Sequence, residues 1–205
     1  MRATILAFCA ALVLSLAPAR AASDAGSFVK ELGDRAIRVL TVKDISEQQR
    51  EDRFRELLRE GFDVRRIGRF VLGRYARGVD PAVMDEYQRL FEDLIVATYA
   101  ARFAEYSGQN FIVKRVVKSK GGRDAIVLSE IRPSDGGPPI RIDWQVHDKN
   151  GVLKIVDVRV EGVSMSVTQR EEFATVIRQN GGKLSALIDA LRKKTIGLKS
   201  KQASR

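Results

Sequence analysis

Residues 140–160 read IRIDWQVHDKNGVLKIVDVRV, and this stretch decides the fold of the chain. Apolar and polar residues alternate through both of its halves, which is typical of β-strands with one face in water. The Asn150-Gly151 pair between the halves is a strong signal for a two-residue hairpin turn. The pattern therefore predicts two antiparallel strands that share one apolar face.

Alternation assigns each residue of this hairpin to one of two faces. The opposite, polar face carries Asp143 and Asp157, which we interpret as cross-strand partners of Arg141 or Arg159. Two more strands are expected upstream, at residues 111–118 and 125–132. In chain order, the expected apolar face of the hairpin contains Ile140, Ile142, Trp144, Val146, Val152, Val156, Val158 and Val160.

Helical periodicity flanks these four strands on both sides. The helices expected before the sheet cover residues 27–40, 46–61, 63–73 and 81–106, and those after it cover 168–179 and 183–195. The basic tail from Arg192 to Arg205 is expected to fray. The order predicts an α+β fold, in which helices cover a curved, four-stranded antiparallel sheet.

The start of the chain is typical of a secretory signal peptide. Arg2 supplies a positive charge, residues 3–16 are apolar, and Ala19-Arg20-Ala21 forms a cleavage site before Ala22. The apolar run is shorter than the roughly 20 residues that span a bilayer, which disfavours a retained membrane anchor. We therefore expect residues 1–21 to be removed and residues 22–205 to form a single domain with a basic C-terminal tail.

The charge of the chain points to an anionic partner. The net charge is +10, and loss of Arg2 and Arg20 with the signal peptide lowers it to +8. Export and the absence of a nucleic-acid motif disfavour nucleic acid. Lipid headgroups, an anionic membrane surface and an acidic protein face remain, as does a simple role in solubility.

Few residues in the chain could support catalysis. Cys9 is lost with the signal peptide, and His147, on the polar face of a strand, is interpreted as a solvated surface residue. Metal-ligand spacing and a phosphate-binding glycine loop are both missing, so no metal or cofactor is expected. We predict that the protein is not an enzyme; the alternative is an enzyme acting on an apolar substrate, with Asp143 or Asp157 as its base.

Three longer stretches resemble a known family. They are residues 62–75 (FDVRRIGRFVLGRY), 98–106 (TYAARFAEY) and 158–173 (VRVEGVSMSVTQREEF), and Asp143-Trp144 and Gly181-Gly182 accompany them. Together they resemble the MlaC family, also called the toluene-tolerance family of periplasmic phospholipid-binding proteins. The resemblance extends over residues 28–191.

The resemblance implies a soluble, monomeric carrier in the periplasm. Such a carrier passes phospholipid between an outer-membrane lipoprotein complex and an inner-membrane ABC transporter complex, and so maintains outer-membrane lipid asymmetry. The implied fold is a nuclear-transport-factor-2-like cone with an apolar interior cavity for acyl chains. Two alternatives stay open: another apolar ligand such as a hopanoid, and an interaction module without lipid.

Periodicity does not distinguish a packed core from an open cavity, and the sequence alone favours a packed core. The family resemblance reverses this expectation and implies a cavity. A guanidinium suits phosphate recognition, so Arg66, Arg69 and Arg74 are candidates for contact with a headgroup or partner, although clustered arginines also form solvated faces. The candidate cavity lining comprises Ile67, Phe70, Val71, Phe91, Ile95, Tyr99, Phe103, Ile142, Trp144, Val146, Val156, Val158, Val160, Val163 and Met165.

The cleavage site can be tested directly. We expect N-terminal sequencing of protein from the periplasmic fraction to start at Ala22, because Ala19 and Ala21 supply the small side chains that signal cleavage requires. Recovery of an intact Met1 in the membrane fraction would contradict this prediction.

Overall fold

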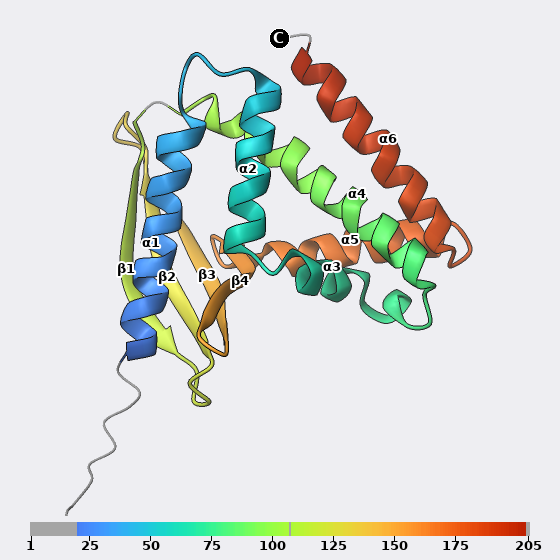
Figure 1. The fold of residues 1–205 in the computed structure, drawn as a ribbon, viewed down its shortest axis with the longest axis horizontal. Helices are drawn as coiled ribbons and strands as arrows, with labels where there is room; N and C mark the ends of the chain where they lie inside the picture. The colour runs from blue at the N-terminus through green and yellow to red at the C-terminus, as the bar shows by residue number, and fades with distance from the viewer. Residues whose placement is uncertain (1–19, 107, 204–205) are drawn as a thin grey trace, which may run out of the picture.

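The structure, a computed structural model, describes residues 20–106 and 108–203 (Figure 1). Most of the expected signal peptide, residues 1–19, lies outside them. Every helix within the described residues is too short or too polar to cross a membrane. Before the sheet come α1 (Arg20–Leu40), α2 (Glu47–Gly61), α3 (Val64–Leu72), the 3-10 turn η1 (Gly73–Ala76), α4 (Pro81–Tyr99) and the 3-10 turn η2 (Ala100–Phe103).

The second half of the chain forms a meander. Its strands are β1 (Asn110–Lys118), β2 (Asp124–Arg132), β3 (Ile140–Lys149), β4 (Val152–Val160) and β5 (Val163–Ser164), followed by α5 (Met165–Gln179) and α6 (Leu184–Ala203). Neighbouring strands pair antiparallel in the order β1-β2-β3-β4-β5. The predicted α+β fold is confirmed, with one strand more than expected because the short β5 folds back on the end of β4.

A bulge in β4 changes which residues face inward. Trp144 pairs with Val158 as alternation predicts, but the register then shifts, so that Val146 pairs with Ile155. Val156 is the extra residue of the bulge, and Ile155 takes the inward position with 0% of its surface exposed. The assignment of Val152 and Val156 to the apolar face was therefore wrong, because strict alternation does not anticipate an inserted residue; Val152, beyond the bulge, is 56% exposed.

Helix α1 covers one part of the inner face of the sheet, the face that carries Val127, Val146 and Ile155. These side chains form a buried cluster with Ala25 and Val29 of α1. Gly26 and Gly33 allow α1 to lie this close to the sheet. A Cβ atom at Gly33, for example, would come within 2.7 Å of the Phe111 ring. Figure 1 shows α1 lying along the strands, while α3 to α6 extend away from them.

The helices α2 to α6, here called the helical layer, have a core of their own centred on Tyr87. The Tyr87 ring stacks on Phe91 at 5.9 Å and meets the edge of Phe173 at 6.4 Å. Its hydroxyl donates to the Gly68 carbonyl at 3.0 Å, and burial raises the pKa of Tyr87 above its usual range. Tyr87 thereby fixes α3 and α5 against α4.

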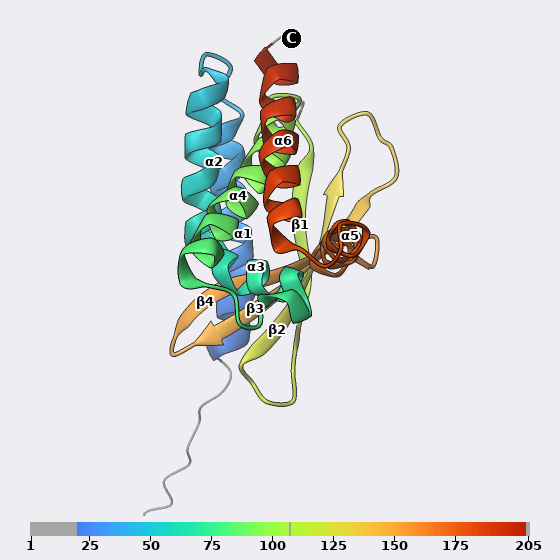
Figure 2. The same ribbon diagram turned by 90° about the vertical axis from the view of Figure 1, so that its right-hand side faces the viewer.

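The C-terminal helix is longer than expected. Helix α6 continues to Ala203 instead of fraying from Arg192, and Figure 2 shows it running beside α4. Ion pairs stabilise this extension: Arg192 pairs with Glu86 of α4, and Lys199 pairs with Glu51 of α2 at 2.9 Å. Two basic residues of the tail thus have acidic partners on the helical layer.

The buried hydroxyl of Tyr87 gives a stability prediction. We expect Tyr87→Phe to lower the free energy of unfolding by about 1–2 kcal/mol, because the buried hydrogen bond from the hydroxyl to the Gly68 carbonyl is lost. Tyr75→Phe is the control, since the Tyr75 hydroxyl accepts a bond from the exposed Arg74; its cost should stay within about 0.5 kcal/mol. Urea unfolding measures both, and equal costs would contradict the assigned role.

Candidate functional site

The two apolar clusters of the molecule have no buried residue in common. Phe62, between α2 and α3, is half-buried and packs against both. Its neighbour Asp63 donates its backbone N–H to the carbonyl of Ile155 at 3.0 Å, which attaches the helical layer to β4. The sheet with α1 and the helical layer are thus separate packing units, joined along β4.

The inner face of the sheet is apolar beyond the part that α1 covers. Under α1, Val127, Val146 and Ile155 are at most 1% exposed. Further along the same face, the side chains stay half-exposed, and these are Ile142, Trp144, Val158 and Val160. An apolar sheet surface that the protein buries only in part indicates a surface that an apolar ligand could cover.

Trp144 is held rigidly in this half-exposed surface. Its indole N–H donates to the Ser129 hydroxyl at 2.9 Å, and Ser129 donates in turn to the Ile142 carbonyl at 2.8 Å. The rings of Phe62 and Phe111 meet it edge-on, with centroids 6.5 and 6.0 Å away. The indole therefore presents a fixed apolar plane while its polar atom is satisfied within the sheet.

The helical candidates fall into two groups. Val71 and Phe91 are 1% and 2% exposed inside the helical core, so both are packed by protein. The half-buried candidates are Ile67, Ile95, Tyr99 and Phe103. Arg102 lies over the Tyr99 ring at 5.5 Å, and Phe103 packs beside Phe54 at 5.9 Å.

The remaining candidates lie on the surface. Phe70, Val163 and Met165 are 43%, 58% and 37% exposed, and none of them belongs to either buried cluster. The arginines Arg66, Arg69 and Arg74 are exposed as well. The structure thus separates the candidate residues into a half-exposed interior face and an outer surface at α3 and the start of α5.

Sequence reasoning missed three residues at this site, Phe62, Phe111 and Ile155. Phe62 directly precedes Asp63, which caps α3, and an apolar residue at that position commonly packs as a hydrophobic staple, so a signal was present. Phe111 lay in an expected strand but was not weighed as a lining residue. Ile155 had no such signal, because only strand pairing reveals the bulge.

Asp157 is held in a structural role. It is 9% exposed and accepts hydrogen bonds from the Ser164 hydroxyl at 2.7 Å and from the hydroxyl and backbone N–H of Ser166. Ser164 also caps α5 through the N–H of Val167. With three donors on its two oxygens, the carboxylate fastens the start of α5 to β4.

His147 also has a partner. Its Nδ1 lies 2.7 Å from Oδ1 of Asp124 on the neighbouring strand, and the imidazole is half-buried. The expectation of a solvated surface histidine was wrong, because alternation placed the residue on the polar face without showing its cross-strand neighbour. The pair stabilises the β2–β3 ladder.

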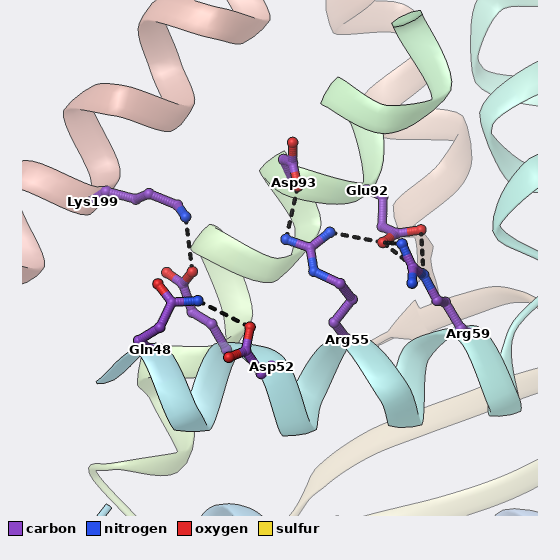
Figure 3. A network of polar contacts seen from close by, with 8 residues as sticks. Gln48, Asp52, Arg55, Arg59, Glu92, Asp93 and Lys199 are labelled. Atoms are coloured by element: carbon purple, nitrogen blue, oxygen red, sulfur yellow. Dashed lines mark hydrogen bonds and ion pairs between the residues drawn. The ribbon is translucent and has the colours of Figure 1, made fainter. Parts of the chain in front are cut away.

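A concavity lies between α2, α3, α4 and the β3–β4 turn. It is a groove of about 1080 Å³ with many charged side chains, including Arg59, Arg89 and Lys149. Figure 3 shows part of its wall, where Arg55 and Arg59 pair with Glu92 at 2.7 and 2.8 Å. The described residues contain no group that could hold a metal ion. This charged lining suits acyl chains less well than the inner face of the sheet does.

The architecture is shared with a solved structure. The phospholipid-binding protein from Ralstonia solanacearum, solved in complex with a phospholipid, superposes with a TM-score of 0.77 at 22% identity. The match covers 85% of this chain and 98% of that one. The chain therefore has the α+β fold of that phospholipid-binding protein, with an open antiparallel sheet beside a helical layer.

The sequence comparison identifies the family. The family described as MlaC protein matches residues 30–193, so the chain belongs to the MlaC family, as the motifs predicted. A curated relative is the toluene tolerance protein ttg2D of Pseudomonas putida, 25% identical over 116 residues. That alignment covers 57% of this chain and about half, 53%, of the relative.

The role of Asp157 in fastening α5 to β4 can be tested with Asp143 as a control on the same face of the sheet. We expect Asp157→Asn to lower the free energy of unfolding by about 1.5–3 kcal/mol, because hydrogen bonds to a buried carboxylate are lost or weakened. Asp143→Asn, on the same face of β3, should change it by less than about 0.5 kcal/mol. Chemical denaturation measures both variants. If the two substitutions cost the same, Asp157 does not fasten α5 to β4.

Proposed function

We propose that the protein is a periplasmic phospholipid carrier that holds acyl chains between the sheet and the helical layer. The observation that carries this proposal is the half-exposed apolar part of the sheet around Trp144 and Val158. Membership of the MlaC family and the phospholipid bound by the structural relative support it.

Energetics require an extensive apolar surface for this task. Each methylene exposed to water costs about 0.8 kcal/mol, so two acyl chains with about 30 methylenes would cost roughly 24 kcal/mol if left in water. A carrier must cover most of that surface. The half-exposed residues that we propose as the lining are Ile67, Ile95, Tyr99, Phe103, Ile142, Trp144, Val158 and Val160.

Exposed apolar residues mark the proposed entrance. Val163 pairs with Val160 across β4 and β5, so it continues the same apolar face to the edge of the sheet. Met165 begins α5 two residues later. Both are exposed, and we propose that they form the rim through which a lipid enters. The flexible thioether of Met165 suits a rim that must adapt to passing chains.

We also propose the route of the carrier. After cleavage near Ala21 and Ala22, the single domain would work as a soluble monomer in the periplasm. It would receive phospholipid from an outer-membrane lipoprotein complex and deliver it to an inner-membrane ABC transporter complex, or the reverse, maintaining lipid asymmetry. No chemical step is needed, in keeping with the engaged carboxylate of Asp157 and the expectation that the protein is not an enzyme.

The decisive experiment is mass spectrometry of lipid extracted from the purified mature protein. We expect co-purifying phospholipid, and its removal should shift the fluorescence of Trp144, the only tryptophan. A hopanoid in the extract would change the ligand class, whereas an extract without lipid would favour an interaction module.

The position of the lining is tested by placing a charge in it. We expect Val158→Asp to abolish lipid retention, because a carboxylate facing acyl chains has no partner and costs several kcal/mol. Val117→Asp introduces the same charge on the outer face of β1 and should retain lipid. Circular dichroism and a melting curve must show that both variants fold. A folded Val158→Asp protein that still carries lipid would show that this face is not the wall.

A further inference from the structure

Exposed apolar residues gather where α3 meets α5. Among the described residues, ten large apolar side chains are exposed, and four of them lie at this junction. Phe70 lies on α3. Val163 lies in β5 just before α5, and Met165 and Val167 lie in the first turn of α5. Such a concentration on one part of a surface marks a site of interaction.

Positive charge surrounds this patch. From Val64 to Val79 the chain has five arginines and no acidic residue. Arg66 and Arg69 are exposed on α3, and neither guanidinium has an ion-pair partner within the described part of the chain. Such unpaired arginines are available to an external anion.

Contacts between the two helices make the patch continuous. The guanidinium of Arg170 on α5 lies over the ring of Phe70 on α3, 5.2 Å from its centroid. Val167 lies one helical turn before Arg170, on the exposed first turn of α5. Figure 1 shows α3 and α5 side by side, and the two helices are in contact. Glu171 and Glu172 of α5 directly follow Arg170, so the positive charge beside the patch comes mainly from α3 and η1.

We infer that this patch, formed by Arg66, Arg69, Phe70, Val167 and Arg170, docks the protein directly on an anionic phospholipid bilayer. Apolar side chains that point outward among unpaired cations match the boundary between headgroups and acyl chains of such a membrane. Each basic residue near an anionic surface contributes attraction, and the apolar side chains insert below it.

A bilayer fits these residues better than the headgroup of the bound lipid. Phe70 is 43% exposed and belongs to neither buried cluster, so it points away from the proposed interior. The proposed rim residues Val163 and Met165 adjoin Val167, so docking through this patch would bring the entrance to the membrane. In this sense the inference rests on the proposed carrier function and names the surface that holds the carrier at the membrane in which its partner complexes lie.

The test is sedimentation of the full mature protein with vesicles. We expect binding to vesicles of phosphatidylglycerol mixed with phosphatidylcholine, weakened by salt, and little binding to phosphatidylcholine alone. Phe70→Ala should weaken binding about tenfold through lost apolar burial. Arg69→Ala should weaken it about fivefold.

Matched controls separate this patch from the general basicity of the chain. Val117→Ala and Arg115→Ala remove an exposed apolar and an exposed basic side chain from β1, and both should bind within about twofold of the parent. The inference is overturned if the parent does not bind, or if Phe70→Ala and Arg69→Ala bind as their controls do.

Lipid retention is measured on the same samples. Phe70→Ala and Arg69→Ala should still co-purify with phospholipid, because both residues lie outside the proposed lining. Vesicle binding without any co-purified lipid would speak against the carrier function. Co-purified lipid without vesicle binding would speak against this docking surface alone.

Discussion

The attachment of the helical layer to β4 is the constraint on which the rest of the structure depends. Along β4 it consists of the hydrogen bond from Asp63 to Ile155, the side chain of Phe62, which contacts both apolar clusters, and the hydrogen bonds between Asp157 and the start of α5. Helix α1 also contacts α2. Each unit nevertheless has its own core: Tyr87 centres one, and the residues beneath α1 form the other. Two cores in one domain leave a boundary between them, and the half-exposed apolar surface lies on that boundary.

Much of the polar chemistry that the sequence offers serves this architecture. Asp157 fastens α5 to β4, and Ser129 satisfies the indole of Trp144. Arg55 joins α2 to α4; burial lowers the pKa of its guanidinium, but bonds to Glu92 and Asp93 outweigh burial and raise it overall (Figure 3). With these groups engaged, partly buried apolar surface and unpaired arginines remain accessible within the described residues, in keeping with the proposed phospholipid ligand.

The two kinds of apolar exposure have different meanings. Trp144 and Val158 are half-exposed on the inner face of the sheet, where a ligand can complete the packing. Phe70 and Val167 are exposed on the outside among arginines, where only an external surface can cover them. In the proposed carrier, their separation would allow lipid to stay inside while the patch binds and releases a membrane.

Local sequence by itself determined the hairpin at Asn150-Gly151, the capped helices, the α+β order and the family, because turns, caps and periodicity depend on residues close in the chain. It could not place Ile155 inward, since a bulge is decided by the partner strand. It could not separate the buried Val146 from the half-exposed Trp144 on one face, because periodicity reports the direction of a side chain and not what covers it. Tertiary packing between segments far apart in sequence decided the rest. It determined that α1 covers only part of the sheet and that Phe70 faces solvent beside Arg170.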